Sequence, residues 1–402
     1  MEKRSCAVIG GGAAGLMAAL TASERGAAVT VFERQARVAR KLMATGNGRC
    51  NLSNTDMRPE RYHGDRAFAE RVFETFSQRD TLELFHSLGL VTVEEPGGRL
   101  YPLSDSAASV ADTLRLRCLA QGVDFRTGTA VRALKRAGSG FAIITDEGSE
   151  TFPRVLVACG GCAGARLGGV SDGYELLCSL GHRRTKLFPS LVQLKTDAAP
   201  IRGLKGIRCD AGVTLLRGDR VIARSAGEVQ FTEYGVSGPA VFDVSRAASV
   251  QGGSLTLALD LVRQLSKPEI VNMLMEKRDS MPALAAEDLL IGVLHNRLGR
   301  VLIKSAGVES AKTAGDVSNR ELAAIAGSCK AFALPVTGTL GFDSAQVTAG
   351  GVETADFDPA TMESRLVPGL FAAGEVLNVD GDCGGYNLQF AWSTGRIGGL
   401  SL

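Results

Sequence analysis

The first forty residues combine short apolar runs with one glycine-rich turn. Residues 5–9 are mostly apolar, residues 10–15 contain four glycines, and residues 16–20 are all good helix formers. A second, mostly apolar run, residues 28–32, ends at Glu33. Short apolar runs bounded by turn residues are typical of buried strands. The pattern therefore predicts a buried strand, a tight turn, a helix and a second strand.

The middle of the chain changes from helical to strand periodicity. Apolar side chains recur at helical spacing after Asp65, between Asp80 and Gly89, and over residues 107–121. Four short runs separated by glycine turns then precede an apolar strand at 155–159, and we expect these runs to form a small antiparallel meander. They are residues 122–126, 130–135, 141–145 and 150–152.

Residues 189–345 have the pattern of an insertion. Short alternating runs up to Leu261 favour a β-barrel or sandwich. Residues 262–329 turn helical, and residues 330–339 return to strand character and are expected to rejoin the barrel. The expected strands of the first part are residues 191–194, 212–216, 221–225, 227–232 and 254–259.

Composition and charge exclude some classes of protein but do not indicate a binding partner. The 45 Lys and Arg nearly balance the 43 Asp and Glu, so no global field favours nucleic acid or an anionic membrane. Glycine is abundant, with 49 of 402 residues. This abundance implies folded sites where the backbone closely approaches a ligand or a neighbouring segment. No apolar run is long enough to span a membrane, and nine scattered cysteines suit a reducing cytoplasm better than a disulfide framework.

The glycine turn matches a dinucleotide-binding fingerprint. Gly10, Gly12 and Gly15 give G-x-G-x-x-G between a predicted strand and a predicted helix. Such glycines let the backbone approach a pyrophosphate, which the helix N-terminus then holds. Glu33 follows at the end of the second strand, about where an acid that binds the ribose is expected. The plain alternative is a glycine turn followed by a surface acid.

Two further segments favour a flavin dinucleotide over a nicotinamide. Residues 40–54 form a polar loop with two glycines and three cations, able to offer N–H groups and guanidinium forks to a diphosphate and a flavin. Near the C-terminus, an apolar run ends at Gly374 and Glu375, and glycines lead into a helix predicted from Tyr386. An acid there can hold a ribityl hydroxyl, and the helix N-terminus can stabilise a reduced flavin. A solvated basic loop and an ordinary last strand and helix are the alternatives.

The spacing of cysteines and histidines gives little support for a redox dithiol or a metal site. Cys159 and Cys162 fit C-x-x-C, which allows a redox dithiol. The intervening Gly-Gly, however, has a sufficient structural reason in a turn beside a cofactor. The four histidines are scattered without metal-ligand spacing, so no metal is expected.

Five segments resemble the signature blocks of a bacterial family of FAD-dependent oxidoreductases, which includes 3-dehydro-bile-acid Δ4,6-reductases and aminoacetone oxidase-like flavoproteins. They are residues 10–15, 40–54, 231–239, 347–352 and 374–389. The resemblance covers essentially the whole chain. It implies an α/β fold in which a two-dinucleotide-fold-type FAD domain, a Rossmann sheet with an antiparallel meander, is interrupted by other domains. The expected pieces are residues 1–188 and 346–402 for the FAD domain, 189–261 with 330–345 for a β-barrel substrate domain, and 262–329 for a helical domain.

The resemblance also implies a set of cofactor-binding residues. Cys159 stands where the family usually has the threonine of Ala-Thr-Gly-Gly, and residues 162–165 replace the expected Ser-Tyr-Pro, so substrate contacts from that loop do not carry over. The residues expected to bind FAD are Gly10, Gly12, Ala13, Ala14, Gly15, Glu33, Arg34, Lys41, Gly46, Asn47, Gly48, Arg49, Cys50, Val131, Ala158, Gly160, Gly161, Gly374, Glu375, Gly384, Gly385, Tyr386, Asn387 and Leu388.

The leading hypothesis is a cytoplasmic flavin-dependent reductase that passes electrons from NAD(P)H to an unsaturated or carbonyl compound. The flavin would carry the chemistry while the protein positions a small-molecule substrate. No second G-x-G-x-x-G follows a strand, so NAD(P)H would dock without its own Rossmann domain. An amine oxidase using O2 and a flavin-containing RNA-binding or protein-binding regulator are the alternatives. Tyr386, Cys50 and Tyr234 are candidate proton donors, each with an ordinary packing explanation.

Overall fold

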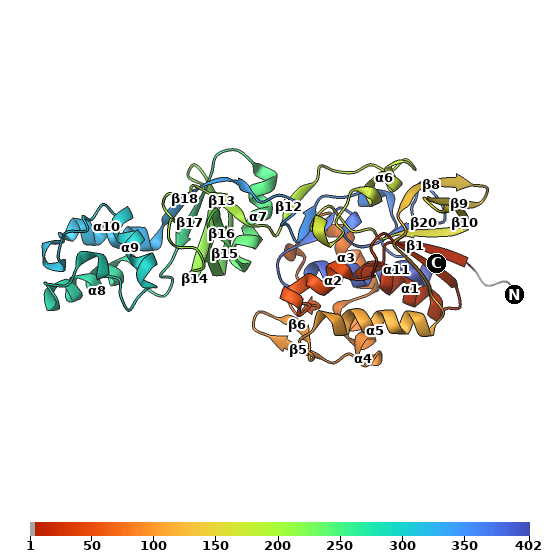
Figure 1. The fold of residues 1–402 in the computed structure, drawn as a ribbon, viewed down its shortest axis with the longest axis horizontal. Coiled ribbons are helices and arrows are strands. Elements are labelled where there is room, and N and C mark those ends of the chain that lie inside the picture. The colour runs from red at the N-terminus through yellow and green to blue at the C-terminus, as the bar shows by residue number, and fades with distance from the viewer. Residues whose placement is uncertain (1–4) are drawn as a thin grey trace. The chain divides into compact units, whose positions relative to one another are not determined.

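The computed structural model describes residues 5–402, in two compact units. One unit contains the chain up to Phe188 together with Phe342–Leu402, and the other contains Pro189–Gly341 (Figure 1). The second unit thus interrupts the first in sequence. Within residues 5–402, no helix combines the length and the apolar character that crossing a membrane requires.

A five-stranded parallel sheet forms the centre of the first unit. Its order is β20 (Leu370–Ala372), β11 (Arg154–Val157), β1 (Ser5–Ile9), β2 (Ala28–Glu33) and β7 (Asp124–Thr127). The side chains of β1, β11 and β20 are almost all buried, as in a parallel sheet covered on both faces, whereas none of the edge strand β7 is buried. The strand from the C-terminal segment completes the sheet begun by the N-terminal segment, so both ends of the chain build one domain.

Two helices from opposite ends of the chain pack tightly together on this sheet. They are α1 (Ala13–Glu24) and α11 (Tyr386–Ser401), and α5 (Ala107–Ala120) also packs on α1. A Cβ added at Gly395 of α11 would lie 2.4 Å from the Ala14 carbonyl oxygen. Only glycine therefore allows the two helices to approach this closely.

The meander is smaller than the sequence predicts. It contains β8 (Val131–Ala137), β9 (Gly140–Thr145) and β10 (Gly148–Phe152), all antiparallel. The expected fourth run, residues 122–126, is wrong as a meander strand because β7 pairs in parallel with β2, with Val31 opposite Phe125. The apolar side chain of Phe125 joins the core of the parallel sheet.

Short elements surround the sheet. β4 (Tyr62–Gly64) pairs with β21 (Val379–Gly381), β12 (Phe188–Ser190) with β19 (Val347–Ala349), and β3 (Ser53–Asn54) joins β6 (Arg99–Pro102) and β5 (Thr92–Glu95). The remaining helices are α2 (Arg40–Ala44), α3 (Arg66–Thr75), α4 (Gln78–Ser87) and α6 (Asp172–Cys178). Asp65 caps α3 by accepting a bond from the Phe68 N–H, as the acid before an apolar helical pattern predicts.

The second unit contains a closed six-stranded barrel, which resolves the choice between barrel and sandwich. Its order is β13 (Leu194–Thr196), β16 (Gly235–Ser237), β15 (Arg220–Phe231), β14 (Arg208–Arg217), β17 (Leu255–Asp260) and β18 (Phe332–Thr339). Helices α8 (Lys267–Ser280), α9 (Asn296–Ser305) and α10 (Asn319–Lys330) share its apolar core. The division of residues 189–345 into separate barrel and helical domains stays a prediction.

Two expectations for the barrel are wrong in detail. Residues 221–225 and 227–232 form the single strand β15, since Gly227 stays in the ladder opposite Ala211 instead of ending a strand. Helix α7 (Pro239–Gln251) lies where only strands and a turn were expected. Its buried positions Ala240, Val241, Val244 and Ala248 follow helical spacing, and Pro239 at its first turn is a helix-start signal.

Candidate cofactor and active site

The glycine turn after β1 leaves room for a ligand at the start of α1. Gly10 has φ +107°, and a Cβ there would lie 2.4 Å from the Ala158 carbonyl oxygen. A Cβ at Gly15 would lie 1.8 Å from the Gly10 carbonyl oxygen, so Gly15 lets the helix pack on the turn. At Gly12, by contrast, a Cβ would meet no atom within 4 Å among the described residues. This open space beside a helix N-terminus suits a pyrophosphate.

Glu33 lies at the edge of the same turn. Its Oε2 accepts a bond from the Gly11 N–H at 2.8 Å, and its Oε1 accepts one from the Gln35 N–H at 2.7 Å. A carboxylate has about four acceptor positions, so ribose hydroxyls can still bind. The Thr129 N–H donates to the Glu33 carbonyl oxygen, which brings the start of β8 and Val131 close to this edge. Arg34 instead pairs with Asp172 at 2.9 Å.

At the other side of the site, four distant segments meet around Glu375. Lys41 Nζ lies 2.6 Å from Glu375 Oε2, and the Thr348 N–H donates to Glu375 Oε1 at 2.9 Å. A Cβ at Gly161 would lie 2.5 Å from Thr348 Oγ1 and 2.7 Å from Glu375 Oε1. The predicted residues Lys41, Gly161 and Glu375 are therefore neighbours. Sequence reasoning missed the role of Thr348 in fixing the carboxylate.

The loop of residues 45–50 presents backbone more than side chains. Gly46, Asn47 and Cys50 all have positive φ, from 56° to 62°. The Arg49 guanidinium pairs with Glu95 and Asp105 and lies over the Tyr101 ring at 4.2 Å. Its charge is therefore already balanced by protein carboxylates.

The start of α11 meets residues 51–54, which follow that loop, through glycines. Gly384 and Gly385 have φ +145° and +98°, and a Cβ at Gly385 would lie 2.4 Å from the Ser53 carbonyl oxygen. Asn387 ties the helix to β21, because its side chain accepts from the Gly381 N–H and donates to the Gly381 carbonyl oxygen, both at 2.8 Å. Asn51 Oδ1 is buried here without a hydrogen-bond partner within residues 5–402. An orphaned acceptor beside the two glycines fits a site that binds a polar group.

The three candidate proton donors differ in surroundings. Cys50 is fully buried, and burial raises the pKa of its thiol to about 12. Tyr386 is 3% exposed and packs edge-to-face on Tyr62, with the ring centroids 5.8 Å apart. Tyr234 lies in the second unit, half-buried in the turn between β15 and β16. Cys50 is thus a protonated core thiol at neutral pH.

The C-x-x-C pair has the environment of structural cysteines. Burial raises the pKa of Cys159 to about 12 and also raises that of Cys162. The Cys159 thiol donates to the Ile9 carbonyl oxygen at 3.5 Å. Reactive dithiols have lowered thiol pKa values, so the structure disfavours a redox role for this pair.

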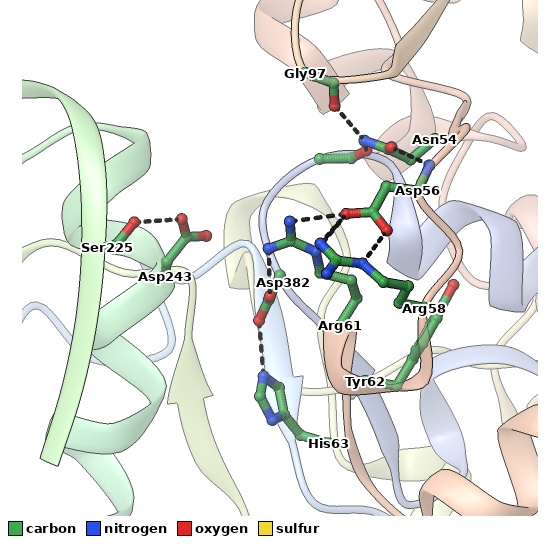
Figure 2. Close-up of polar contacts among 12 residues, drawn as sticks. Asn54, Asp56, Arg58, Arg61, Tyr62, His63, Gly97, Ser225, Asp243 and Asp382 are labelled. Carbon is green, nitrogen blue, oxygen red and sulfur yellow. Dashed lines mark hydrogen bonds and ion pairs between the residues drawn. The ribbon is translucent and has the colours of Figure 1, made fainter.

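A cluster of ionisable side chains near the start of α11 was not singled out from the sequence. His63 Nε2 lies 2.8 Å from Asp382 Oδ1, and Arg61 Nη1 lies 3.5 Å from Asp382 Oδ2 (Figure 2). Asp56 binds Arg58 and Arg61, which lowers the pKa of its carboxyl well below the usual range. His63 and Asp382 are 319 residues apart, so spacing alone gave no signal for their contact.

The parallel sheet with its meander, the glycine turn at α1 and the second anchor at α11 define the class of FAD-dependent oxidoreductases. The chain belongs to the family described as HI0933-like protein Rossmann domain, whose pattern matches residues 4–401. It is therefore a flavoprotein enzyme with a Rossmann-type sheet, as the resemblance predicts.

Relatives of known name cover nearly the whole chain. It is 40% identical over 400 residues to the 3-dehydro-bile acid delta(4,6)-reductase of Clostridium scindens, covering 98% of this chain and 97% of that protein. It is 28% identical to the ribosomal RNA dihydrouridine synthase of Escherichia coli, over 98% and 96% of the two chains. In fold it is similar to the 3-ketosteroid delta1-dehydrogenase of Sterolibacterium denitrificans, with a TM-score of 0.51, 13% identity and 99% coverage of both chains.

The described residues fit FAD. The open space at Gly12 would receive the pyrophosphate, Glu33 the ribose, and Glu375 with Lys41 the ribityl chain, while the start of α11 would face the flavin ring. When bound, FAD supplies two-electron redox chemistry. The protein's own contribution would be to orient the cofactor and the substrate.

Proposed function

We propose that this protein is an FAD-dependent reductase that saturates a carbon–carbon double bond conjugated with a carbonyl group in a small molecule of the 3-oxo bile-acid type. The observation that carries the proposal is the 40% identity over almost the full chain to a 3-dehydro-bile acid delta(4,6)-reductase. The open space at Gly12, the Glu33 carboxylate and the Lys41–Glu375 pair support the cofactor part of the proposal.

Electrons come from NAD(P)H in this proposal. The chain has no second strand followed by G-x-G-x-x-G, so the nicotinamide docks transiently without a Rossmann domain of its own. Such docking is compatible with two half-reactions, in which NAD(P)H leaves before the substrate binds.

The test follows the flavin absorbance under anaerobic conditions in a stopped-flow instrument. NADH or NADPH is expected to bleach the oxidised flavin, and a 3-oxo-Δ4,6 bile acid is expected to restore it. Absence of bleaching with both nucleotides would overturn the proposed donor. Rapid peroxide formation with an amine donor would instead support the oxidase alternative.

A second candidate substrate is RNA, because two relatives at 28% and 27% identity are ribosomal RNA dihydrouridine synthases. The uracil ring also contains a double bond conjugated with a carbonyl group, so one site chemistry would serve both substrates. We rank the small-molecule substrate first because the bile acid reductase is more similar to this chain than the RNA enzymes are. The formal charge of only +2 also disfavours RNA binding. Reoxidation of the reduced flavin by unmodified ribosomal RNA, with dihydrouridine formation, would reverse that ranking.

A further inference from the structure

His63 and Asp382 form a hydrogen-bonded pair that the cofactor-binding residues do not explain. His63 lies in β4, and Asp382 directly follows β21, which pairs antiparallel with β4. The ladder aligns Asp380 with His63 and Gly381 with Tyr62. This register brings Asp382 Oδ1 to 2.8 Å from His63 Nε2 (Figure 2).

The backbone of Asp382 is held in place on both sides of the residue. The Asp382 N–H donates to the Arg61 carbonyl oxygen at 2.9 Å, and Asn387 Nδ2 donates to the Asp382 carbonyl oxygen at 3.4 Å. Arg61 itself is fixed by Asp56, with Nε and Nη2 at 3.0 and 2.9 Å from one carboxylate oxygen. Asp382 can therefore orient the imidazole and balance its positive charge, as an acid beside a general acid–base histidine does.

The pair also lies next to the segment that the proposed cofactor site would place against the flavin ring. Asp382 lies in the loop that leads into Gly384, Gly385 and α11, the segment expected to face the flavin ring. The His63 and Asp382 side chains are 24% and 17% exposed, so solvent and substrate can reach them. Cys50 and Tyr386 are at most 3% exposed.

We propose that His63 donates the proton in the reduction of the conjugated double bond, and that Asp382 is its positioning residue. The inference rests on the proposed function. In the reaction the carbon–carbon π bond breaks, the carbon β to the carbonyl receives a hydride from the reduced cofactor, and the α carbon receives the proton of the imidazolium. The substrate is reduced by two electrons, the cofactor is oxidised, and His63 regains its proton from solvent.

The test compares H63Q, D382N and wild-type holoenzyme in separate half-reactions. H63Q is expected to slow flavin reoxidation by the enone about 100-fold, the lower end of general acid catalysis. D382N keeps the imidazole and is expected to slow it about tenfold. Flavin reduction by NAD(P)H and reoxidation by ferricyanide, which takes electrons without a proton at carbon, should change less than about twofold. H86Q, at an exposed histidine of α4, is the matched control.

Two readouts separate proton donation from a structural role. In D2O the wild type should place deuterium on one face of the α carbon, and H63Q should lose that selectivity. The visible flavin spectrum and the melting temperature of both variants should stay like those of the wild type. Equal enone reoxidation in H63Q and wild type would overturn this assignment alone. Failure of wild-type enzyme to reduce any enone or uracil would overturn the proposed function and this assignment with it.

Discussion

The two ends of the dinucleotide site are built by different means. At the α1 end, one continuous segment, Gly10 to Glu33, makes the site mostly from backbone, and the close approaches at Gly10 and Gly15 depend on the absence of a Cβ. At the α11 end, the Lys41 and Glu375 side chains and the Thr348 N–H meet from distant segments. A backbone site fails sterically when it is changed, whereas a side-chain site loses its contacts one by one.

The largest effect is expected from adding a methyl group at the α1 turn, where the site is built from backbone. Gly15→Ala would place a Cβ 1.8 Å from the Gly10 carbonyl oxygen, so the helix must shift off the strand. Because overpacking with side chains already costs about 1–3 kcal/mol, we expect a loss of about 3 kcal/mol or more in unfolding free energy. The melting temperature of the apoprotein measures it, and unchanged stability would show that the turn relaxes freely.

Gly12→Ala is the matched control for that variant. Its Cβ meets no described atom within 4 Å, so the unfolding free energy of the apoprotein should stay within about 0.5 kcal/mol of the wild-type value. The added methyl group would instead occupy the space assigned to the pyrophosphate, and we expect FAD affinity to fall at least about tenfold. Unchanged FAD affinity by fluorescence titration would contradict the assignment of this space.

At the α11 end, substitution of a single side chain is expected to have a smaller effect. Glu375→Gln removes the charge partner of Lys41, whose Nζ lies 2.6 Å away, in a pair that is 18% and 29% exposed. We expect FAD affinity to fall about tenfold, equivalent to about 1.4 kcal/mol. Lys41→Met should have a similar effect, and the double variant should lose less than the sum because the two residues act as a pair. Strict additivity in titrations would show that each residue contacts the cofactor independently.

A substitution at Arg49 tests whether the side chain of this residue, or only its backbone, contributes to FAD binding. Its guanidinium pairs with Glu95 and Asp105 and lies over Tyr101. Arg49→Lys loses the planar fork that suits this arrangement, so a lower melting temperature is expected while FAD affinity changes less than about twofold. A large loss of FAD affinity with unchanged stability would mean that the guanidinium leaves its carboxylates for the diphosphate.

The α1 end of the site could be predicted from the sequence, whereas the contacts at the α11 end could not. The fingerprint Gly10, Gly12 and Gly15 lies within one turn, so its spacing alone predicts the strand, turn and helix. The contacts of Lys41 with Glu375 and of His63 with Asp382 join residues more than 300 positions apart. Strands β4 and β21 have only three residues each, too few for a period-two pattern to be recognised. Their register, and with it the histidine pair, required the structure.

The smallest effect is expected at the C-x-x-C turn between these two ends. Cys159 packs under the turn with its thiol bonded to the Ile9 carbonyl oxygen, and burial raises its pKa to about 12. A thiol with a raised pKa is protonated throughout neutral pH, and its alkylation by iodoacetamide should accelerate only as pH rises well above 9, the reverse of a redox dithiol. Cys162→Ser should therefore leave turnover within about twofold of wild type. Rapid alkylation at pH 7, protected by bound substrate, would restore a chemical role to a turn that otherwise serves to bring the Gly161 backbone against Glu375.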